Sequence, residues 1–238
     1  MKLSSITKKV LSVFTVSVLL LVTQSVMALP KAFQANYTVK KGSMTLGNLH
    51  TSLKYSGNNY SYHKYTKATG FAALLTGIKI TENTDGKVAG QIITPTNYFF
   101  NQSKRGGGKV DKVNFSRSTA SGSYKKEPFK IKTPHGVQDK ASMELLLARD
   151  LSNNKSRLSY NIVSHGETSQ YNFQKLGHEV LKTPAGTFNT IKVKVVRSGN
   201  ERETVFWMAK ELDYMPAKIR HRENKDVIST VIKNYKKL

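Results

Sequence analysis

Cysteine is absent from the sequence, and this absence excludes several kinds of chemistry at once. The chain can form no disulfide, no thiolate metal site and no cysteine nucleophile, and no lipid can be attached to an N-terminal cysteine. Because no covalent cross-link can help, stability has to come from a hydrophobic core. A chain of 238 residues is long enough to bury one.

Recognisable catalytic motifs are missing as well. No serine stands in a G-x-S-x-G elbow, so a serine hydrolase is not indicated. None of the six histidines belongs to an H-x-x-x-H or H-E-x-x-H pair, the spacings that favour zinc on a helix. We therefore predict no catalytic residue, no metal site and no cofactor. An enzyme whose site has no linear signature stays open as an alternative.

The first 28 residues have the pattern of a secretory signal peptide. Lys2, Lys8 and Lys9 form a positive region, an apolar run extends from Val10 to Val22, and small residues precede a cleavage position at Ala28. A membrane anchor is the alternative, but the run is shorter than the roughly 20 residues that span a bilayer. We expect the leader to be cleaved and the mature chain to be a soluble periplasmic protein, not a lipoprotein.

Acidic residues are scarce, with 15 Asp and Glu against 38 Lys and Arg. Loss of the three leader lysines lowers the formal net charge from +23 to +20, which still creates a potential that attracts anions. After export the available polyanions are lipid headgroups and acidic envelope polymers, so we expect such a partner and peripheral membrane contact, and no nucleic acid. The alternative is that the charge only solvates the surface.

Most of the chain alternates with a period of two, which is typical of strands buried on one face. Apolar residues alternate with polar ones between residues 33 and 39, and similar segments recur to the C-terminus between turns rich in glycine and asparagine. A phase shift at Leu176-Gly177 indicates a bulge. Residues 205–208 are apolar on both faces, which indicates a central strand. The segment 71–80 is compatible with a buried strand or one helical turn.

One helix is predicted over residues 139–152. Asp139 can cap its first turn, and Asn153-Asn154 can end it. Apolar residues then form one stripe: Met143, Leu146, Leu147 and Leu151. Glu144 and Asp150 fall on the flank of this helix, where we expect them to be solvated. The pattern as a whole predicts a single, mainly β domain over residues 29–238, an antiparallel meander that forms a barrel or half-barrel with the helix packed on it.

A family resemblance is carried mainly by the last hundred residues. The matching segments are Gly177-His178-Glu179, Thr183-Pro184-Ala185-Gly186-Thr187-Phe188, Trp207, Tyr214-Met215-Pro216-Ala217-Lys218-Ile219, and Gln138-Asp139 with Ser142 and the leucines that follow. They resemble the exported bacterial family called domain of unknown function 3108. The resemblance covers residues 33–235 and implies an envelope location and a β-rich fold. It implies no catalytic or binding residue, and the strong positive charge is a departure from the usual family member.

Fold and charge together lead to a binding hypothesis. A curved sheet covered by a helix can hold an apolar ligand in its mouth. We therefore expect a carrier or binding module for an amphipathic anionic envelope component such as a lipid, with apolar chains inside the barrel and the headgroup on basic residues. The candidate ligand residues are Lys192, Lys194, Arg197, Trp207 and Arg220. A core position is the alternative for the tryptophan, and a non-catalytic envelope assembly or structural factor is the alternative for the protein.

Overall fold

An antiparallel sheet that curls round a helix forms the protein. The computed structural model describes residues 29–199 and 201–238, so the predicted leader and its cleavage position at Ala28 lie outside the described residues. Eight strands precede the helix: β1 (Phe33–Lys41), β2 (Met44–Ser56), β3 (Asn59–Ala68), β4 (Lys79–Ala89), β5 (Ile92–Lys104), β6 (Gly107–Phe115), β7 (Thr119–Tyr124) and β8 (Glu127–Lys132). Six follow it: β9 (Leu158–Ser164), β10 (Glu167–Thr183), β11 (Gly186–Val196), β12 (Arg202–Ala209), β13 (Met215–Glu223) and β14 (Asp226–Lys237).

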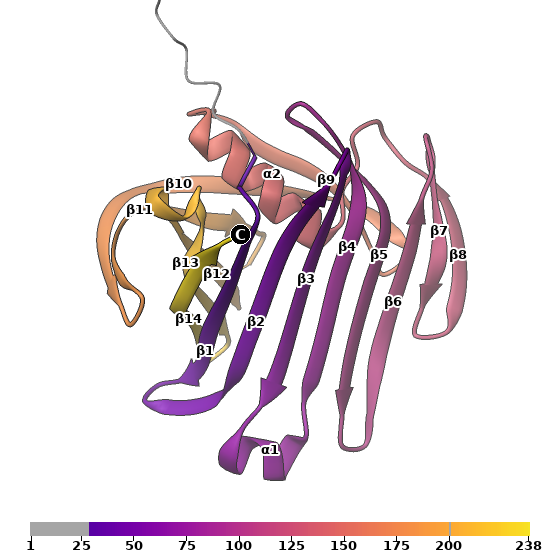
Figure 1. Ribbon diagram of the computed structural model, residues 1–238. Coiled ribbons are helices and arrows are strands. Elements are labelled where there is room, and N and C mark those ends of the chain that lie inside the picture. The colour runs from indigo at the N-terminus through magenta and orange to yellow at the C-terminus, as the bar shows by residue number, and fades with distance from the viewer. Residues whose placement is uncertain (1–28, 200) are drawn as a thin grey trace, which may run out of the picture.

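The first and last strands are neighbours, which joins the two halves of the meander. The strand order is β8-β7-β6-β5-β4-β3-β2-β1-β14-β13-β12-β11-β10-β9. The described residues also contain three short interruptions of the meander: α1 (Gly70–Thr76), α2 (Lys140–Ser152) and the 3-10 helix η1 (Lys210–Leu212). Figure 1 shows α2 inside the curve of the sheet and α1 at the tips of β3 and β4. The predicted fold class, an antiparallel meander with a helix packed on it, is confirmed.

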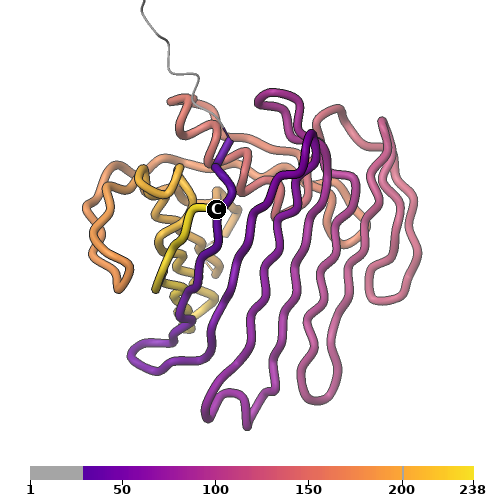
Figure 2. The backbone as a smooth tube through the Cα atoms, viewed as in Figure 1, coloured from indigo at the N-terminus to yellow at the C-terminus, as the bar shows by residue number. Residues whose placement is uncertain are grey.

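The turns lie at two opposite ends of the sheet, because each strand runs antiparallel to its neighbours. We call the end that carries α1 and the turns after β1, β5, β7 and β13 the lower end. The upper end carries the turns after β2, β4 and β6, as the tube in Figure 2 makes plain. Segment 71–80, which the sequence leaves undecided, is the short helix α1 followed by the start of β4.

The sheet stays open, since its edge strands β8 and β9 are not hydrogen-bonded to each other. Contacts from β6 and β7 cross the opening to the turn between β9 and β10. The backbone N–H of His165 donates to the buried Asp111 carboxylate at 2.9 Å, and the ring of Tyr124 packs on the imidazole of His165 with centroids 4.3 Å apart. The segment before α2 also joins β9 through a bridge between Gln138 and Ile162. The protein is therefore a half-barrel whose open side is crossed by these contacts.

Helix α2 is buried nearly all round, not only along the predicted stripe. Asp139 caps it as predicted, because its carboxylate accepts from the backbone N–H groups of Ala141 and Ser142 at 2.8 Å. The prediction that Glu144 and Asp150 are solvated is wrong, since both are buried. The sheet wraps the flanks of the helix as well as its apolar face, and this wrapping buries the two carboxylates.

Two further sequence predictions are confirmed in the second half of the sheet. The register between β10 and β11 shifts at Leu176, where a bulge was expected. All residues from Val205 to Met208 are buried in β12, which lies between β11 and β13.

Candidate functional site

Four of the five predicted ligand residues share the outer face of β11–β13. Lys192 is in register with Trp207, while Lys194 and Arg220 are both in register with Val205. Arg197 lies on the other face, where its guanidinium donates to the hydroxyl of Thr204 at 3.0 Å. The structure thus brings together a basic patch on the convex side of the sheet rather than a ring at the mouth of a barrel.

Trp207 is buried beneath two lysines on this outer face. The ammonium of Lys192 lies 5.3 Å from the ring centroid, and that of Lys218 lies 4.6 Å from it. Both distances are within cation–π range. Lys192 also pairs with Glu179 at 3.0 Å, and this contact holds the pKa of Glu179 below its usual value. Because the lysines cover the indole, Trp207 offers no free stacking platform.

The most perturbed charged groups lie inside the half-barrel, between β3, β4 and α2. The ammonium of Lys64 contacts Glu144 at 2.6 Å and Glu82 at 3.1 Å. The hydroxyl of Tyr62 donates to Glu144 at 3.1 Å, and that of Tyr98 donates to Glu82 at 2.9 Å. Every polar end in this cluster therefore has a partner, as buried charges require.

The pKa values of this cluster follow from burial and from one shared ammonium. Burial alone would lower the pKa of Lys64, but Glu144 and Glu82 outweigh it and raise that pKa. For Glu82, Lys64 and the Tyr98 hydroxyl outweigh burial, so its pKa is lowered. Burial dominates for Glu144, whose pKa is raised. The cluster joins the sheet to α2, and its charged groups are all engaged within it.

Asp139 forms a second buried polar group at the start of α2. Besides the two backbone N–H groups, its carboxylate accepts from the Thr84 hydroxyl at 2.6 Å, and Thr84 contacts the Tyr60 hydroxyl at 3.3 Å. Burial raises the pKa of Asp139 from 3.8 to about 6, although these hydrogen bonds oppose the rise. A raised pKa in the folded state means that the folded protein binds this proton more tightly. The contribution of Asp139 to stability is therefore greatest below pH 4 and is lost as the pH rises through 6.

Substitution Asp139→Asn tests this ionisation. Asparagine caps a helix about as well as aspartate but cannot ionise. The free energy of unfolding of Asp139→Asn, relative to wild type, should rise by about 2–3 kcal/mol between pH 4 and pH 7. Urea denaturation at several pH values measures it. Asp139→Ala should show the same slope from a lower starting point, because it also loses the cap, worth about 1 kcal/mol. A difference that stays flat over this pH range would contradict a pKa near 6.

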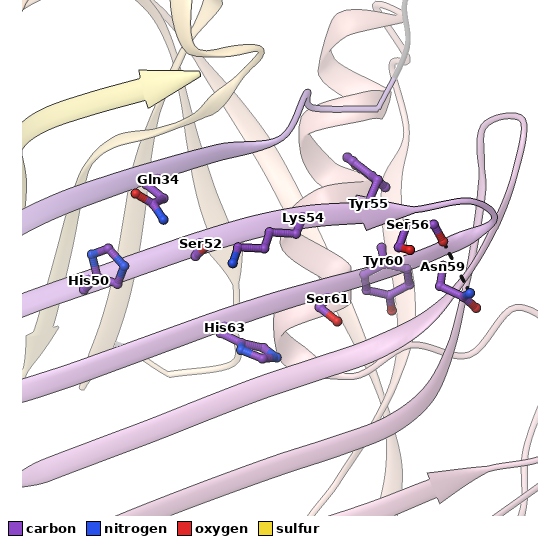
Figure 3. Close-up of a pocket in the computed structure, with 10 residues that line it drawn as sticks. All are labelled: Gln34, His50, Ser52, Lys54, Tyr55, Ser56, Asn59, Tyr60, Ser61 and His63. Carbon is purple, nitrogen blue, oxygen red and sulfur yellow. Dashed lines mark hydrogen bonds between the residues drawn. The ribbon is translucent and has the colours of Figure 1, made fainter. Parts of the chain in front are cut away.

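A first cavity lies on the outer face of β1–β3 and has a volume of about 550 Å³. Figure 3 shows polar side chains from three strands along it, among them His50, Ser52, Lys54 and His63. Two of these are already engaged, because His50 hydrogen-bonds to Asn36 at 2.9 Å and His63 lies 3.5 Å from Asp85. This groove suits a polar ligand better than an amphipathic one.

A second cavity, which we call the upper cleft, has a volume of about 500 Å³. It opens between the β4–β5 turn, the β6–β7 turn and the segment that leads into α2. Six of its fourteen lining residues have apolar side chains: Ile92, Ile93, Pro95, Phe115, Pro134 and Val137. Lys87, Arg117 and His135 stand on the same lining and are exposed to solvent. The cleft therefore combines an apolar wall with a basic rim.

Gln138 is the buried polar residue of the upper cleft. It is only 1% exposed, and its side-chain N–H₂ donates to the carbonyls of Gly136 and Ile93 at 3.0 and 3.3 Å. Its side-chain oxygen has no hydrogen-bond partner among the described residues. A buried acceptor without a donor is costly, and a hydroxyl or amide of a ligand would satisfy it.

Sequence reasoning missed this cleft because its residues come from separate turns. Lys87, Arg117 and His135 show no common spacing, and only the sheet register brings their segments to one end. The signal that existed was Gln138, a polar residue directly before the cap of the predicted helix.

The described residues offer neither a cluster of metal ligands nor a membrane-spanning helix. No group of three His, Asp or Glu side chains there is arranged to hold a metal ion. No helix in the described part of the chain has the length and apolar character needed to cross a bilayer.

Comparisons with known proteins give a family and a fold. A family model described as protein of unknown function, DUF3108, matches residues 33–229. The chain is similar to a β-barrel-like protein of domain of unknown function DUF1849 from Brucella abortus, with a TM-score of 0.55, 6% identity, and coverage of 87% of this chain and 98% of that one. It also matches a Parabacteroides distasonis protein described provisionally as a lipoprotein, with a TM-score of 0.34, 7% identity, and coverage of 89% and 98%. No curated protein matches the sequence. At 6% identity, the first likeness shows the fold alone.

Proposed function

We propose that this chain, which belongs to the family of proteins of unknown function DUF3108, is a non-catalytic binding or carrier module for an amphipathic anion. The proposal rests on the geometry of the chain itself. The upper cleft is the binding site. The proposal includes export to the periplasm, which rests on the leader pattern of residues 1–28 and on the absence of a lipid-accepting cysteine.

The observation that carries the proposal is the buried side-chain oxygen of Gln138, which has no hydrogen-bond partner among the described residues and belongs to a residue that lines a cleft with apolar walls and a basic rim. Ligand sites are typically apolar concavities of about 300–1,000 Å³ with a few placed polar groups. The upper cleft has this size and this composition. Apolar parts of a ligand would lie against Ile93 and Val137, a hydroxyl would donate to Gln138, and a negative group would face Lys87 and Arg117.

The site differs from the one that the sequence suggested. The hypothesis placed apolar chains inside the barrel, but side chains of α2 occupy that space. The outer basic patch with Lys192, Lys194 and Arg220 stays a candidate for long polyanions. It is a weaker one, because Glu179 neutralises Lys192 at 3.0 Å and Glu203 neutralises Arg220 at 2.6 Å.

Loss of the basic rim should weaken binding of an anionic amphiphile. We expect Lys87→Gln/Arg117→Gln to bind lysophosphatidylglycerol about tenfold less tightly than wild type. Two exposed ion pairs contribute roughly 1–2 kcal/mol in total, which corresponds to this factor. Titration followed by native mass spectrometry measures the affinity, with zwitterionic lysophosphatidylcholine as the comparison lipid.

The matched control is Lys182→Gln/Lys233→Gln, which removes two exposed lysines far from the cleft. It should bind as wild type does. Equal losses in both variants would show a general charge effect and would exclude the upper cleft. A wild-type protein that takes up neither lipid, and that carries none when purified from its own periplasm and extracted with organic solvent, would refute the carrier.

A second candidate is a non-catalytic assembly or structural factor of the cell envelope. One observation favours it: the interior is filled by α2, while large apolar side chains stand exposed on α1. Such a factor would show no lipid in the same mass-spectrometry experiment and would instead retain a protein partner.

A further inference from the structure

Helix α1 is an apolar tip held rigidly at the lower end of the sheet. It joins β3 to β4, and backbone hydrogen bonds tie it on both sides. The N–H of Thr69 donates to the carbonyl of Leu46 in β2 at 3.0 Å, and the N–H of Arg105 in the β5–β6 turn donates to the carbonyl of Thr76 at 2.9 Å. The tip is therefore part of the sheet framework and projects beyond the strands (Figure 1).

The large side chains of α1 face solvent. Phe71, Leu74 and Leu75 are 67%, 65% and 60% exposed, and no residue of the helix is buried. Their spacing of three and four residues puts them on one face of a helix. Met44, in the neighbouring β1–β2 turn region, is 49% exposed. An apolar cluster of this kind on a water-facing tip makes no contribution to the core and indicates an interaction surface.

Three chain segments that flank or adjoin this tip are basic and contain no Asp or Glu. We call residues 40–44, 67–79 and 103–107 the lower rim. They include no Asp or Glu, and they hold six cations: Lys40, Lys41, Lys67, Lys79, Lys104 and Arg105. Among the described residues, Lys41 pairs with Asp226 at 2.7 Å, and the other five have no carboxylate within ion-pair distance. The rim is therefore a positive collar round an apolar tip.

We propose that α1 and the lower rim dock this protein onto the surface of an anionic phospholipid bilayer. Apolar residues that enter the interface and basic residues that face anionic headgroups are the two signals that stable peripheral binding needs. A second copy of the chain fits less well, because two positive collars would repel each other. This surface is separate from the upper cleft, which lies at the opposite end of the sheet.

Vesicle flotation tests the proposal with two lipid compositions. Wild-type protein should bind vesicles of phosphatidylcholine with about 30% phosphatidylglycerol at least about tenfold more tightly than vesicles of phosphatidylcholine alone, because several lysines face the anionic surface. Salt at about 1 M should remove most of this difference, since it screens charges beyond about 3 Å. Equal binding to both compositions would overturn the proposal, and so would binding to neither, which would leave a protein as the occupant.

Matched variants locate the contact. Phe71→Ala/Leu74→Ala/Leu75→Ala should lower the partition coefficient about tenfold or more, because exposed side chains that enter the interface are lost. Leu176→Ala/Val180→Ala/Val196→Ala removes three exposed apolar residues elsewhere and should bind as wild type does. Lys67→Gln/Lys79→Gln/Lys104→Gln should also weaken binding, in contrast to Lys54→Gln/Lys182→Gln/Lys233→Gln. If the α1 variant binds as tightly as its control, α1 is not the docking element.

A fluorescence measurement reports insertion directly. In Phe71→Trp the new indole is exposed in solution, so anionic vesicles should shift its emission to the blue, whereas the buried Trp207 of wild type should show little change. No shift in the presence of bound vesicles would contradict entry of α1 into the interface. Uptake of lysophosphatidylglycerol by the α1 variant is measured separately, so failure of membrane docking and failure of the upper cleft are distinguishable.

Discussion

Substitution of Lys64 by methionine should lower the free energy of unfolding by about 3–5 kcal/mol, because removal of one member of a buried charge cluster leaves the others uncompensated. Glu82 and Glu144 lie 3.1 and 2.6 Å from its ammonium and would remain buried beside each other. Methionine has a similar length and packs well, so the loss reports charge rather than volume. Urea denaturation at pH 7 measures the change.

The control is a variant in which the whole cluster is neutral: Lys64→Met/Glu82→Gln/Glu144→Gln. Glutamine side chains keep oxygens that accept from the hydroxyls of Tyr62 and Tyr98. Replacing a complete buried charge cluster is often nearly neutral for stability. We therefore expect the triple variant to recover most of the loss. If it is as unstable as Lys64→Met, packing around Lys64 rather than its charge determines the effect.

Leu145→Ala should be the most damaging single truncation in the flank of α2, with a loss of about 3 kcal/mol from the cavity and the buried area. Leu145 lies outside the stripe that the sequence predicts, yet it is fully buried. A one-sided helix would tolerate this change, whereas a helix enclosed by the sheet would not. Thermal or urea unfolding therefore distinguishes the two descriptions of α2.

Leu75→Ala in α1 is the matched comparison, because it truncates a helical leucine that is largely exposed. Its free energy of unfolding should stay within about 0.5 kcal/mol of wild type, as is usual for surface substitutions. A large loss there would mean that α1 is packed against the protein and would remove the apolar tip from the membrane proposal. A small loss for Leu145→Ala would mean that the sheet does not enclose α2 tightly.

The two proposed surfaces divide the molecule into ends with different chemistry. The upper cleft offers an apolar wall and an unpaired acceptor at Gln138, which suit a single amphipathic ligand. The lower rim offers an apolar tip and a collar without acids, which suit a charged interface. A protein docked by its lower end would present the upper cleft away from the bilayer. The ligand site and the membrane-binding site would then lie at opposite ends of the same strands.

The sequence by itself determined the local elements of this protein. Alternation of apolar and polar residues is a property of each strand, and the capping residue Asp139 and the bulge at Leu176 act over a few positions. These features depend on neighbours along the chain, so they could be predicted without knowing the fold. The family resemblance in the last hundred residues was likewise readable from short segments, and the family model confirms it.

Only the tertiary structure decided which charges are buried and which apolar residues are exposed. Glu144 has the spacing of a solvated flank position, but the curled sheet brings Lys64 to it from a strand that lies 80 positions away. Phe71 and Leu74 look like core residues in the sequence, but the pairing of β3 with β4 places them on a tip beyond the sheet. Strand register brings the β4–β5 turn, the β6–β7 turn and the segment before α2 together at the upper cleft. Burial depends on how all the elements pack together, whereas periodicity describes one element at a time. For this reason the candidate sites could not be predicted from the sequence.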